Sequence, residues 1–314
     1  TRRRNLGIGA VAVVVLAVTS IVLATTVFSP SHPKAVATIG DERTADPCSL
    51  IDPNAVKRFG STSISTDYGN FNRCDVLLAK GDNDLADVEV SLEEGPAPDD
   101  IKGAKTSHVG AITELSAPRD GGNCDRFLLL RDGNYVDVDA KLTSNLSMDV
   151  CTAATLEAAH VVGVLNKGPV ARRKAPWPHG SLATTDTCAL LDNTTLAHIP
   201  GLPRTKADPD FGRWSCYWGD GSTRMSAQVW YDHDAVLTDG QKVRLHGRTT
   251  FVVPRYDSDD SCTARIVFRA YVDADGTHRN ELVNVEAAGP RSINELCDDA
   301  RSMAANVATH LAKA

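Results

Sequence analysis

The sequence lacks the short motifs that accompany common enzyme chemistries. It contains no GxSxG, HExxH, GxGxxG or Walker loop, the patterns that position a nucleophile, a zinc ion or a phosphate group. It also lacks a CxxC pair, and close cysteine spacing is typical of structural zinc sites. The sequence therefore indicates no catalytic residue, no metal and no cofactor.

Basic residues are fewer than acidic ones. The chain has 33 Lys and Arg against 40 Asp and Glu, a net charge of −7. Three of the basic residues are Arg2–Arg4, and leaving them out gives 30 basic against 40 acidic residues. Because an acidic surface repels nucleic acid and anionic lipid head groups, we expect no nucleic-acid partner.

An uncharged, apolar stretch follows these arginines, from Leu6 to Phe28. As a helix rising about 1.5 Å per residue, it matches a hydrocarbon core of about 30 Å. The arginines before it predict a cytoplasmic N-terminus and extracellular domains. We therefore expect residues 1–28 to anchor the chain in the cell membrane as a single-pass signal-anchor. The alternative is a signal peptide cleaved near Ala35–Ala37.

The eight cysteines form two sets of four. Corresponding members of the sets lie 140, 142, 138 and 146 residues apart, which indicates one four-cysteine domain present twice. An even number of cysteines beyond a membrane segment predicts disulfides in an oxidising compartment, the alternative being buried free thiols. The disulfide cysteines would be Cys48, Cys74, Cys124, Cys151, Cys188, Cys216, Cys262 and Cys297.

Proline-containing segments separate these units. Residues 29–44 are predicted to be a tether, and residues 167–184 a linker. The two four-cysteine domains would then span residues 45–166 and 185–314, each large enough for its own core.

Each domain shows the same order of predicted elements. A short helix, at 53–59 and 193–198, precedes two hairpins of alternating apolar and polar residues. A final amphipathic helix follows, at 150–165 and 293–311. We expect an α+β fold, in which an antiparallel sheet of four or more strands is packed by helices and held by two disulfides. The order along the chain suggests pairing first with second and third with fourth, although four cysteines allow three connectivities.

Short motifs around the first two cysteines of each set point to a family. Asp46–Ile51 reads Asp-Pro-Cys-Ser-Leu-Ile and precedes Arg73-Cys74, while Asp186–Leu191 precedes Ser215–Trp218. This pattern resembles actinobacterial exported domains found in lipoproteins of unknown function and, more distantly, extracytoplasmic sensor domains of receptor Ser/Thr kinases. The resemblance implies binding or sensing in the cell envelope. The chain differs in having no lipid-bearing cysteine and no kinase domain.

Three acidic groups offer weak alternatives for chemistry. Asp273–Gly276, with Glu281 downstream, departs from a calcium loop at its later ligand positions and is interpreted as a hairpin turn. Asp232–Asp234 is interpreted as a solvated loop, because neighbouring residues on a strand point to opposite faces. The pairs Glu93-Glu94 and Asp99-Asp100 flank a proline-containing segment and are interpreted as solvated carboxylates.

Aromatic residues distinguish the second domain from the first. It contains Trp214, Trp218 and Trp230, three of the four tryptophans of the chain. Strand alternation would place Trp214 and Trp218 beside Cys216 in the core, and Tyr217 and Trp230 on the polar face. An exposed pair of Tyr217 and Trp230 would suit stacking on a sugar or peptide.

These patterns predict a non-enzymatic, membrane-anchored extracytoplasmic binding or sensor protein. Its site would be the Tyr217–Trp230 patch or a cleft between the two domains, and its ligand an envelope protein, a peptide or a glycan. The alternatives are an extracytoplasmic hydrolase without a recognisable motif, and a structural partner in an envelope complex.

Overall fold

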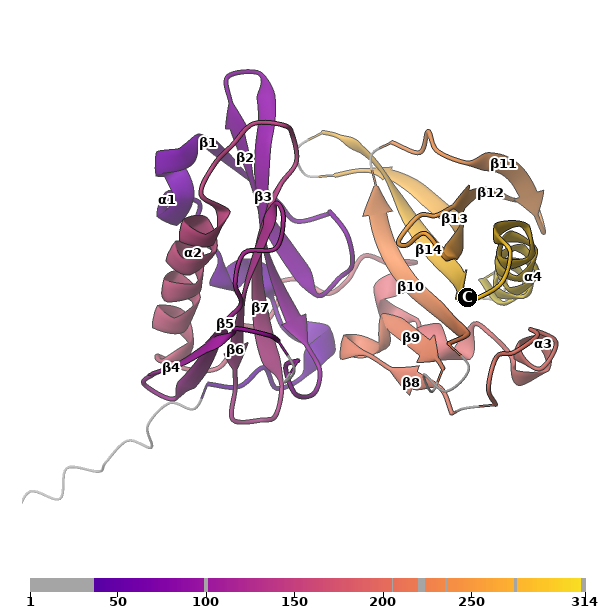
Figure 1. The fold of residues 1–314 in the computed structure, drawn as a ribbon, viewed down its shortest axis with the longest axis horizontal. Coiled ribbons are helices and arrows are strands. Elements are labelled where there is room, and N and C mark those ends of the chain that lie inside the picture. Colours follow the sequence, from indigo (N-terminus) through magenta and orange to yellow (C-terminus); the bar gives the residue numbers. More distant parts are fainter. Residues whose placement is uncertain are drawn as a thin grey trace, which may run out of the picture. The chain divides into compact units, whose positions relative to one another are not determined.

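The computed structural model describes residues 37–98, 101–204, 206–219, 224–234, 236–273 and 276–311. Residues 35–314 form one compact unit, drawn in Figure 1. The predicted anchor at 1–28, residues 29–36 of the tether and the pair Asp99-Asp100 lie outside the described residues. Within the described ranges, no helix is long and apolar enough to cross a membrane.

The first half of the described chain (residues 45–166) forms a seven-stranded antiparallel sheet. Its strand order is β1-β2-β3-β7-β6-β5-β4, so that β3 and β7 are central. The strands are β1 (Ser61–Ser65), β2 (Arg73–Lys80), β3 (Asn83–Glu93), β4 (Lys105–Val109), β5 (Ile112–Ser116), β6 (Asn123–Leu129) and β7 (Tyr135–Leu142).

The second half (residues 185–314) forms another seven-stranded antiparallel sheet, with the order β11-β12-β13-β14-β10-β9-β8. Its strands are β8 (Asp208–Pro209), β9 (Ser215–Trp218), β10 (Ser226–Asp234), β11 (Gln241–Leu245), β12 (Arg248–Pro254), β13 (Ser261–Val272) and β14 (His278–Ala288). Numbered within each half, both sheets have the order 1-2-3-7-6-5-4. The predicted similarity of the halves is confirmed at the level of topology, and each sheet has three strands beyond the predicted hairpins.

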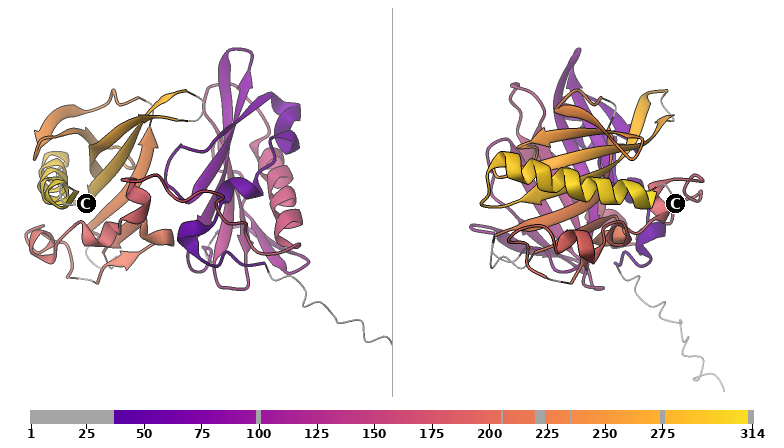
Figure 2. Two further views of the ribbon diagram at one scale, coloured as in Figure 1. Left: turned by 180° about the vertical axis from the view of Figure 1, so that it is seen from behind. Right: turned by 90° about the vertical axis from the view of Figure 1, so that its right-hand side faces the viewer.

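One long helix covers one face of each sheet (Figures 1 and 2). Helix α2 (Val150–Leu165) packs on β6 and β7, and α4 (Ile293–Leu311) packs on β13 and β14. The shorter helices α1 (Pro53–Val56) and α3 (Asn193–Leu196) begin at the caps Asp52 and Asp192. Aspartate is favoured at the residue before a helix because its carboxylate accepts hydrogen bonds from the free N–H groups of the first turn. In the described part of the chain, six 3-10 turns complete the helical segments: η1 (Glu42–Thr44), η2 (Pro47–Leu50), η3 (Lys57–Phe59), η4 (Leu182–Thr184), η5 (Thr187–Ala189) and η6 (Phe211–Arg213).

Two disulfides lie at equivalent places in each half. The first of each pair joins an opening 3-10 turn to the second strand, and the other joins the sixth strand to the long helix. The bonds are Cys48–Cys74, Cys124–Cys151, Cys188–Cys216 and Cys262–Cys297. This is the pairing that the order along the chain suggested.

The long helices leave one face of each sheet without a helix. On β3, Val88 and Val90 are buried on the helix side, so alternation directs Glu89 and Glu93 to the other face. On β10, Val229 is buried in the same way, and Trp230 takes the other face. We call these two surfaces the helix-free faces, and both are predominantly polar.

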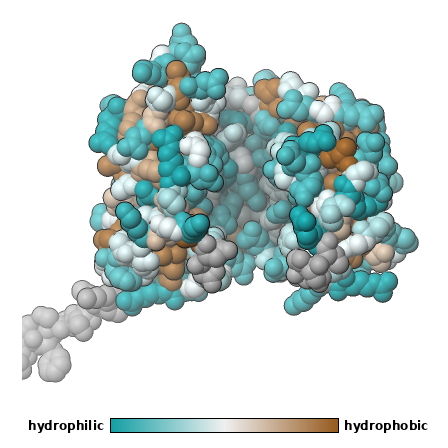
Figure 3. Space-filling view, viewed as in Figure 1, coloured by the Kyte–Doolittle hydropathy of each residue, from teal (hydrophilic) through white to brown (hydrophobic). Residues whose placement is uncertain are grey.

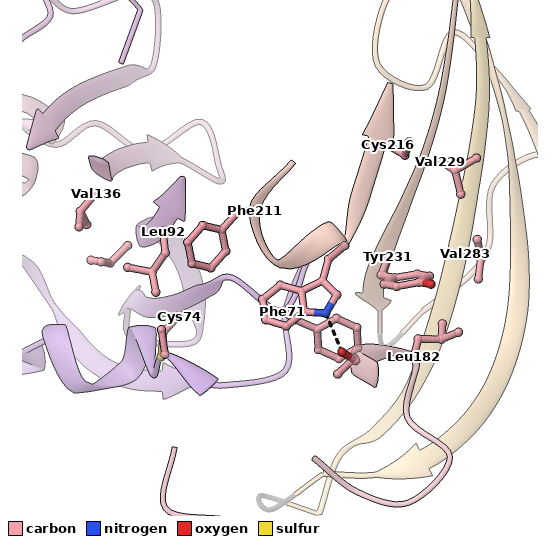
Figure 4. Packing of buried hydrophobic residues seen from close by; sticks show 14 of the residues in the cluster. Phe71, Cys74, Leu92, Val136, Leu182, Phe211, Cys216, Val229, Tyr231 and Val283 are labelled. Atoms are coloured by element: carbon pink, nitrogen blue, oxygen red, sulfur yellow. Dashed lines mark hydrogen bonds between the residues drawn. The ribbon is translucent and has the colours of Figure 1, made fainter. Parts of the chain in front are cut away.

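The two halves share a continuous hydrophobic core. Phe71, in the loop between β1 and β2, packs against Trp177, Trp214, Tyr231 and His233 at ring-centroid distances of 5.0, 5.5, 5.9 and 4.7 Å. Figure 4 shows Phe71 beside Tyr231 of the second half. We call these five residues the aromatic junction.

Hydrogen bonds to backbone atoms reinforce the aromatic junction. The Nδ1 atom of His233 lies 2.8 Å from the Gly69 carbonyl oxygen, and the Gly69 N–H donates to the His233 carbonyl at 3.4 Å. The Trp214 indole N–H donates to the Ala183 carbonyl at 2.8 Å. Gly69 has a φ of +70°, a region that favours glycine. The loop between β1 and β2 can thus turn at Gly69 without strain and pack against the second half.

We expect that replacing Cys188 and Cys216 together by alanine will lower the free energy of unfolding by about 2–4 kcal/mol, because the unfolded chain loses a cross-link. Urea denaturation followed by circular dichroism measures this loss. The matched variant, Cys48→Ala with Cys74→Ala, removes the equivalent bond and should show a loss of similar size. A negligible loss in both variants would contradict a stabilising role for these bonds.

Candidate functional site

A pocket of about 290 Å³ is lined by residues from both helix-free faces and from adjoining loops. The first half contributes Asn70, Asn72 and Glu93, and the second contributes Asp210, Ser215, Gln228, Trp230 and Asp257. We call it the Trp230 pocket. Figure 3 shows that the surface is hollowed between the two halves and that hydrophilic residues predominate there.

Strand register explains the position of Trp230. In the β9–β10 pair, Gln228 lies opposite Tyr217 and Trp230 lies opposite Ser215, so these four side chains share one face. Trp230 is partly buried and lines the pocket. Tyr217 is 37% exposed on the same face and is not among the pocket residues. The structure therefore places the two predicted aromatic residues on the expected face but only one of them in the pocket.

The remaining tryptophans of the second half are structural. Trp214 and Trp218 are buried beside the disulfide of Cys216, as alternation predicted. Trp214 belongs to the aromatic junction and precedes β9 rather than lying within it. Trp230 is the one of these three that lines the Trp230 pocket, while Trp218 lines a separate pocket beside α3.

The polar side chains around Trp230 are held by hydrogen bonds. Gln228 donates to the Ser215 hydroxyl at 3.0 Å, and Asn72 donates to Glu93 Oε1 at 3.2 Å. Asn70 accepts from the backbone N–H of Phe71 at 2.8 Å. These bonds orient amide and hydroxyl groups that still have capacity for a ligand.

Burial alters the pKa of Glu93, which lines the pocket, and of Glu286, which neighbours the lining residue Asp257. Burial, with smaller contributions from Asp210 and Asp137, raises the pKa of Glu93 well above its usual range. Burial and the neighbouring Asp257 raise the pKa of Glu286 to about 7. Glu93 therefore keeps its proton to higher pH than an ordinary glutamate, and in the protonated form it offers a hydrogen-bond donor without charge.

An acidic cluster covers the central part of the helix-free face of the first half. Arg73 pairs there with Asp75, Asp87 and Glu89, and Lys141 pairs with Asp87 and Glu89. Nearby, Asp137 and Asp139 each have a buried oxygen without a hydrogen-bond partner. Burial is the largest cause that raises the pKa of Asp75 to about 8 and that of Asp139 to about 7. Among the described residues, no group of three His, Cys, Asp or Glu could hold a metal ion.

Two of the acidic groups noted in the sequence occupy other positions than expected. Asp232–Asp234 was expected to be a solvated loop, but it ends strand β10, and His233 is buried. Asp232 and Asp234 both bind Arg265, at 3.2 and 2.8 Å. Glu93 was expected to be solvated, but it ends β3 and is half-buried in the pocket. In both places the strand extends further than the sequence pattern indicated.

The candidate calcium ligand Glu281 is part of a strand. It is fully buried in β14, where it pairs with Arg269 and accepts hydrogen bonds from the Ser181 hydroxyl and the Leu182 N–H. Residues 274 and 275 of the predicted turn lie outside the described residues.

Ser181 and His233 are the nucleophile and base types that a hydrolase would require, and both line a second cavity. However, the Ser181 hydroxyl donates to Glu281 at 2.7 Å, and His233 Nδ1 is directed to Gly69. In the described part of the chain, therefore, these two residues are not hydrogen-bonded as a nucleophile and its base.

Comparison with known proteins assigns no family to the chain. No family model matches it, and no curated protein matches it. Among solved structures, a mutant of the vaccine antigen transferrin binding protein B from Haemophilus parasuis Hp5 aligns at 8% identity with a TM-score of 0.10. The alignment covers 70% of this chain and 64% of that protein. A similarity this low supports no conclusion about fold or function.

The acidic cluster predicts that stability falls as pH rises. Asp139 binds its proton more tightly in the folded chain (pKa about 7) than an unfolded aspartate does (about 3.9). Its stabilising contribution is fully present below about pH 4 and is lost as pH rises through 7. Replacing Asp139 by asparagine should therefore stabilise the protein at pH 8 by about 1 kcal/mol, since solvent screens part of the effect.

Thermal unfolding at about pH 3.5 and pH 8 measures this effect. The variant and the wild type should differ at pH 8 and agree at about pH 3.5, below the pKa of an unfolded aspartate. Asp84→Asn, at an exposed position of β3, is the control and should change neither value. A variant that is destabilised equally at both pH values would contradict the linkage.

Proposed function

We propose that this protein is a membrane-anchored, non-enzymatic binding or sensor protein of the bacterial cell envelope, and that its ligand is a glycan held in the Trp230 pocket. The observation that carries the proposal is the position of Trp230, an indole on a polar sheet face inside a pocket otherwise lined by amide, hydroxyl and carboxyl groups.

The composition of the pocket favours a neutral polyhydroxylated ligand. An indole ring offers a flat apolar surface for the C–H face of a sugar ring. Asn70, Asn72, Gln228 and Glu93 supply donors and acceptors for hydroxyl groups. No Lys or Arg lines the pocket, which disfavours an anionic ligand. The volume lies near the lower end of about 300–1,000 Å³ for small-molecule sites, so one sugar unit of a longer glycan would fit.

The rest of the chain supports the envelope location. Four disulfides are typical of an oxidising compartment outside the cytoplasm. The apolar segment Leu6–Phe28 after Arg2–Arg4 is the proposed anchor. A ligand in a pocket with walls from both halves contacts both of them at once. It would favour the arrangement of the halves that binds it best, and this supports a sensing role.

We expect Trp230→Ala to weaken binding to peptidoglycan fragments by about tenfold, since the stacking surface is lost. Pull-down with insoluble peptidoglycan and calorimetric titration with soluble fragments measure the change. Trp230→Phe should retain part of the affinity. Unaltered melting temperatures would show that both variants are folded.

Tyr217→Ala distinguishes the pocket from the exposed aromatic patch. If the pocket is the site, this variant binds as the wild type does, whereas both variants lose affinity if the patch is the site. Full binding by Trp230→Ala would refute the pocket. Release of shorter fragments by the wild type, abolished in Glu93→Gln, would instead favour the hydrolase, and binding only to an envelope protein would favour the structural role.

A further inference from the structure

A second cavity of about 430 Å³ lies where the linker meets both halves. It shares no lining residue with the Trp230 pocket. Phe71, Trp177 and Tyr271 form aromatic walls, and Arg173 and Arg269 supply positive charge. The two cavities thus differ in chemistry, since no basic residue lines the first.

The Arg173 side chain contacts the ring of Trp177 in this cavity, and its backbone N–H donates to the Thr44 carbonyl at 2.8 Å. Its guanidinium carbon lies 3.5 Å from the centroid of the Trp177 ring, the geometry of a cation–π interaction. The Nε–H group is buried and has no hydrogen-bond partner. No carboxylate of the described residues forms an ion pair with this side chain within 4.0 Å, in contrast to Arg73 and Arg265 on the helix-free faces. A ring stacked on the flat side of a guanidinium leaves its edge free, and that edge matches a carboxylate with two parallel hydrogen bonds.

Tyr271 supplies a second unpaired donor. Its hydroxyl oxygen is buried without a partner, which is costly unless a ligand satisfies it. The ring is fixed by an edge contact with His233, at 6.1 Å between centroids, and by Arg269, whose guanidinium carbon lies 5.3 Å from the ring centroid. Tyr271 is therefore held in place before any ligand arrives.

The acidic side chains at this cavity have partners of their own, apart from Asp67. Glu281 pairs with Arg269 and accepts from Ser181, and Asp273 pairs with Arg279 at 3.0 Å. Asp67 acts on both Arg173 and Tyr271, and Asp46 acts more strongly on Arg173, in each case through electrostatics without an ion pair to Arg173 within 4.0 Å. Arg173 thus keeps its charge available for a ligand.

We propose that this cavity binds a small organic carboxylate with a flat, apolar body. The carboxylate accepts hydrogen bonds from the edge of Arg173 and from the Tyr271 hydroxyl, while the body packs against Phe71 and Trp177. Such a ligand would contact the linker and both halves at once. The site is independent of the proposed glycan pocket.

Titration of the full chain with benzoate, followed by calorimetry and by protein NMR shifts, tests the proposal. We expect saturable binding in wild type, a loss of about tenfold or more in Arg173→Gln, and a smaller loss in Tyr271→Phe. Acetate should bind more weakly than benzoate because it lacks the apolar body. Inorganic phosphate at equal concentration should not compete.

Lys174→Gln is the matched control, because it removes one exposed positive charge beside Arg173 without altering the cavity lining. It should bind benzoate as the wild type does. The proposal is overturned by absence of saturable binding in wild type, by undiminished binding in Arg173→Gln, or by equal losses in both linker variants. A melting temperature near that of wild type is expected for all three variants, since neither the Arg173 side chain nor the Tyr271 hydroxyl makes a hydrogen bond to the described residues.

Discussion

The packing of Phe71 into the aromatic junction is the interaction on which both candidate sites depend. Its ring is only 6% exposed and contacts the linker and the second half. The flanking residues Asn70 and Asn72 line the Trp230 pocket, whereas Phe71 itself lines the Arg173 cavity. One short loop therefore determines the geometry of two cavities of different chemistry, and a change in its position alters both.

Electrostatics gives the two helix-free faces different characters. The first half concentrates carboxylates around Arg73 and Lys141, and burial raises the pKa of several of them. The second half neutralises Asp232 and Asp234 with Arg265 and adds the indole of Trp230. Because like charges in a buried face are costly, the first face stabilises the fold best when partly protonated. The carboxyl groups of this face thus make the stability of the fold depend on pH, and they also make the face hydrophilic.

Much of the fold could be predicted from local patterns. Cysteine offsets predicted the duplication, alternation placed Trp218 and Trp230 on their faces, helical spacing placed α4, and the likeness of the two halves placed α2. The edge strand β4 and its neighbour β5 were missed because they are short and mostly polar or half-buried, which leaves no clear period.

The lining of the candidate site was harder to predict. Trp230 was found because strand alternation exposes it, but Glu93 and Asp210 were not connected with it. They come from segments far apart in the sequence, which only the packing of the two halves brings together. The role of Arg173 was hidden for the same reason, since a basic run in a proline-containing linker normally lies in solvent.

The shared topology has a consequence for how such sites arise. Two identical copies related by a twofold axis would present the same side chains on both walls of any groove between them. Joining the copies in one chain removes that constraint, so each wall can change separately. Here one wall is an acidic surface and the other carries a tryptophan. In a symmetric homodimer each substitution would appear on both walls, so the two walls could not differ in this way.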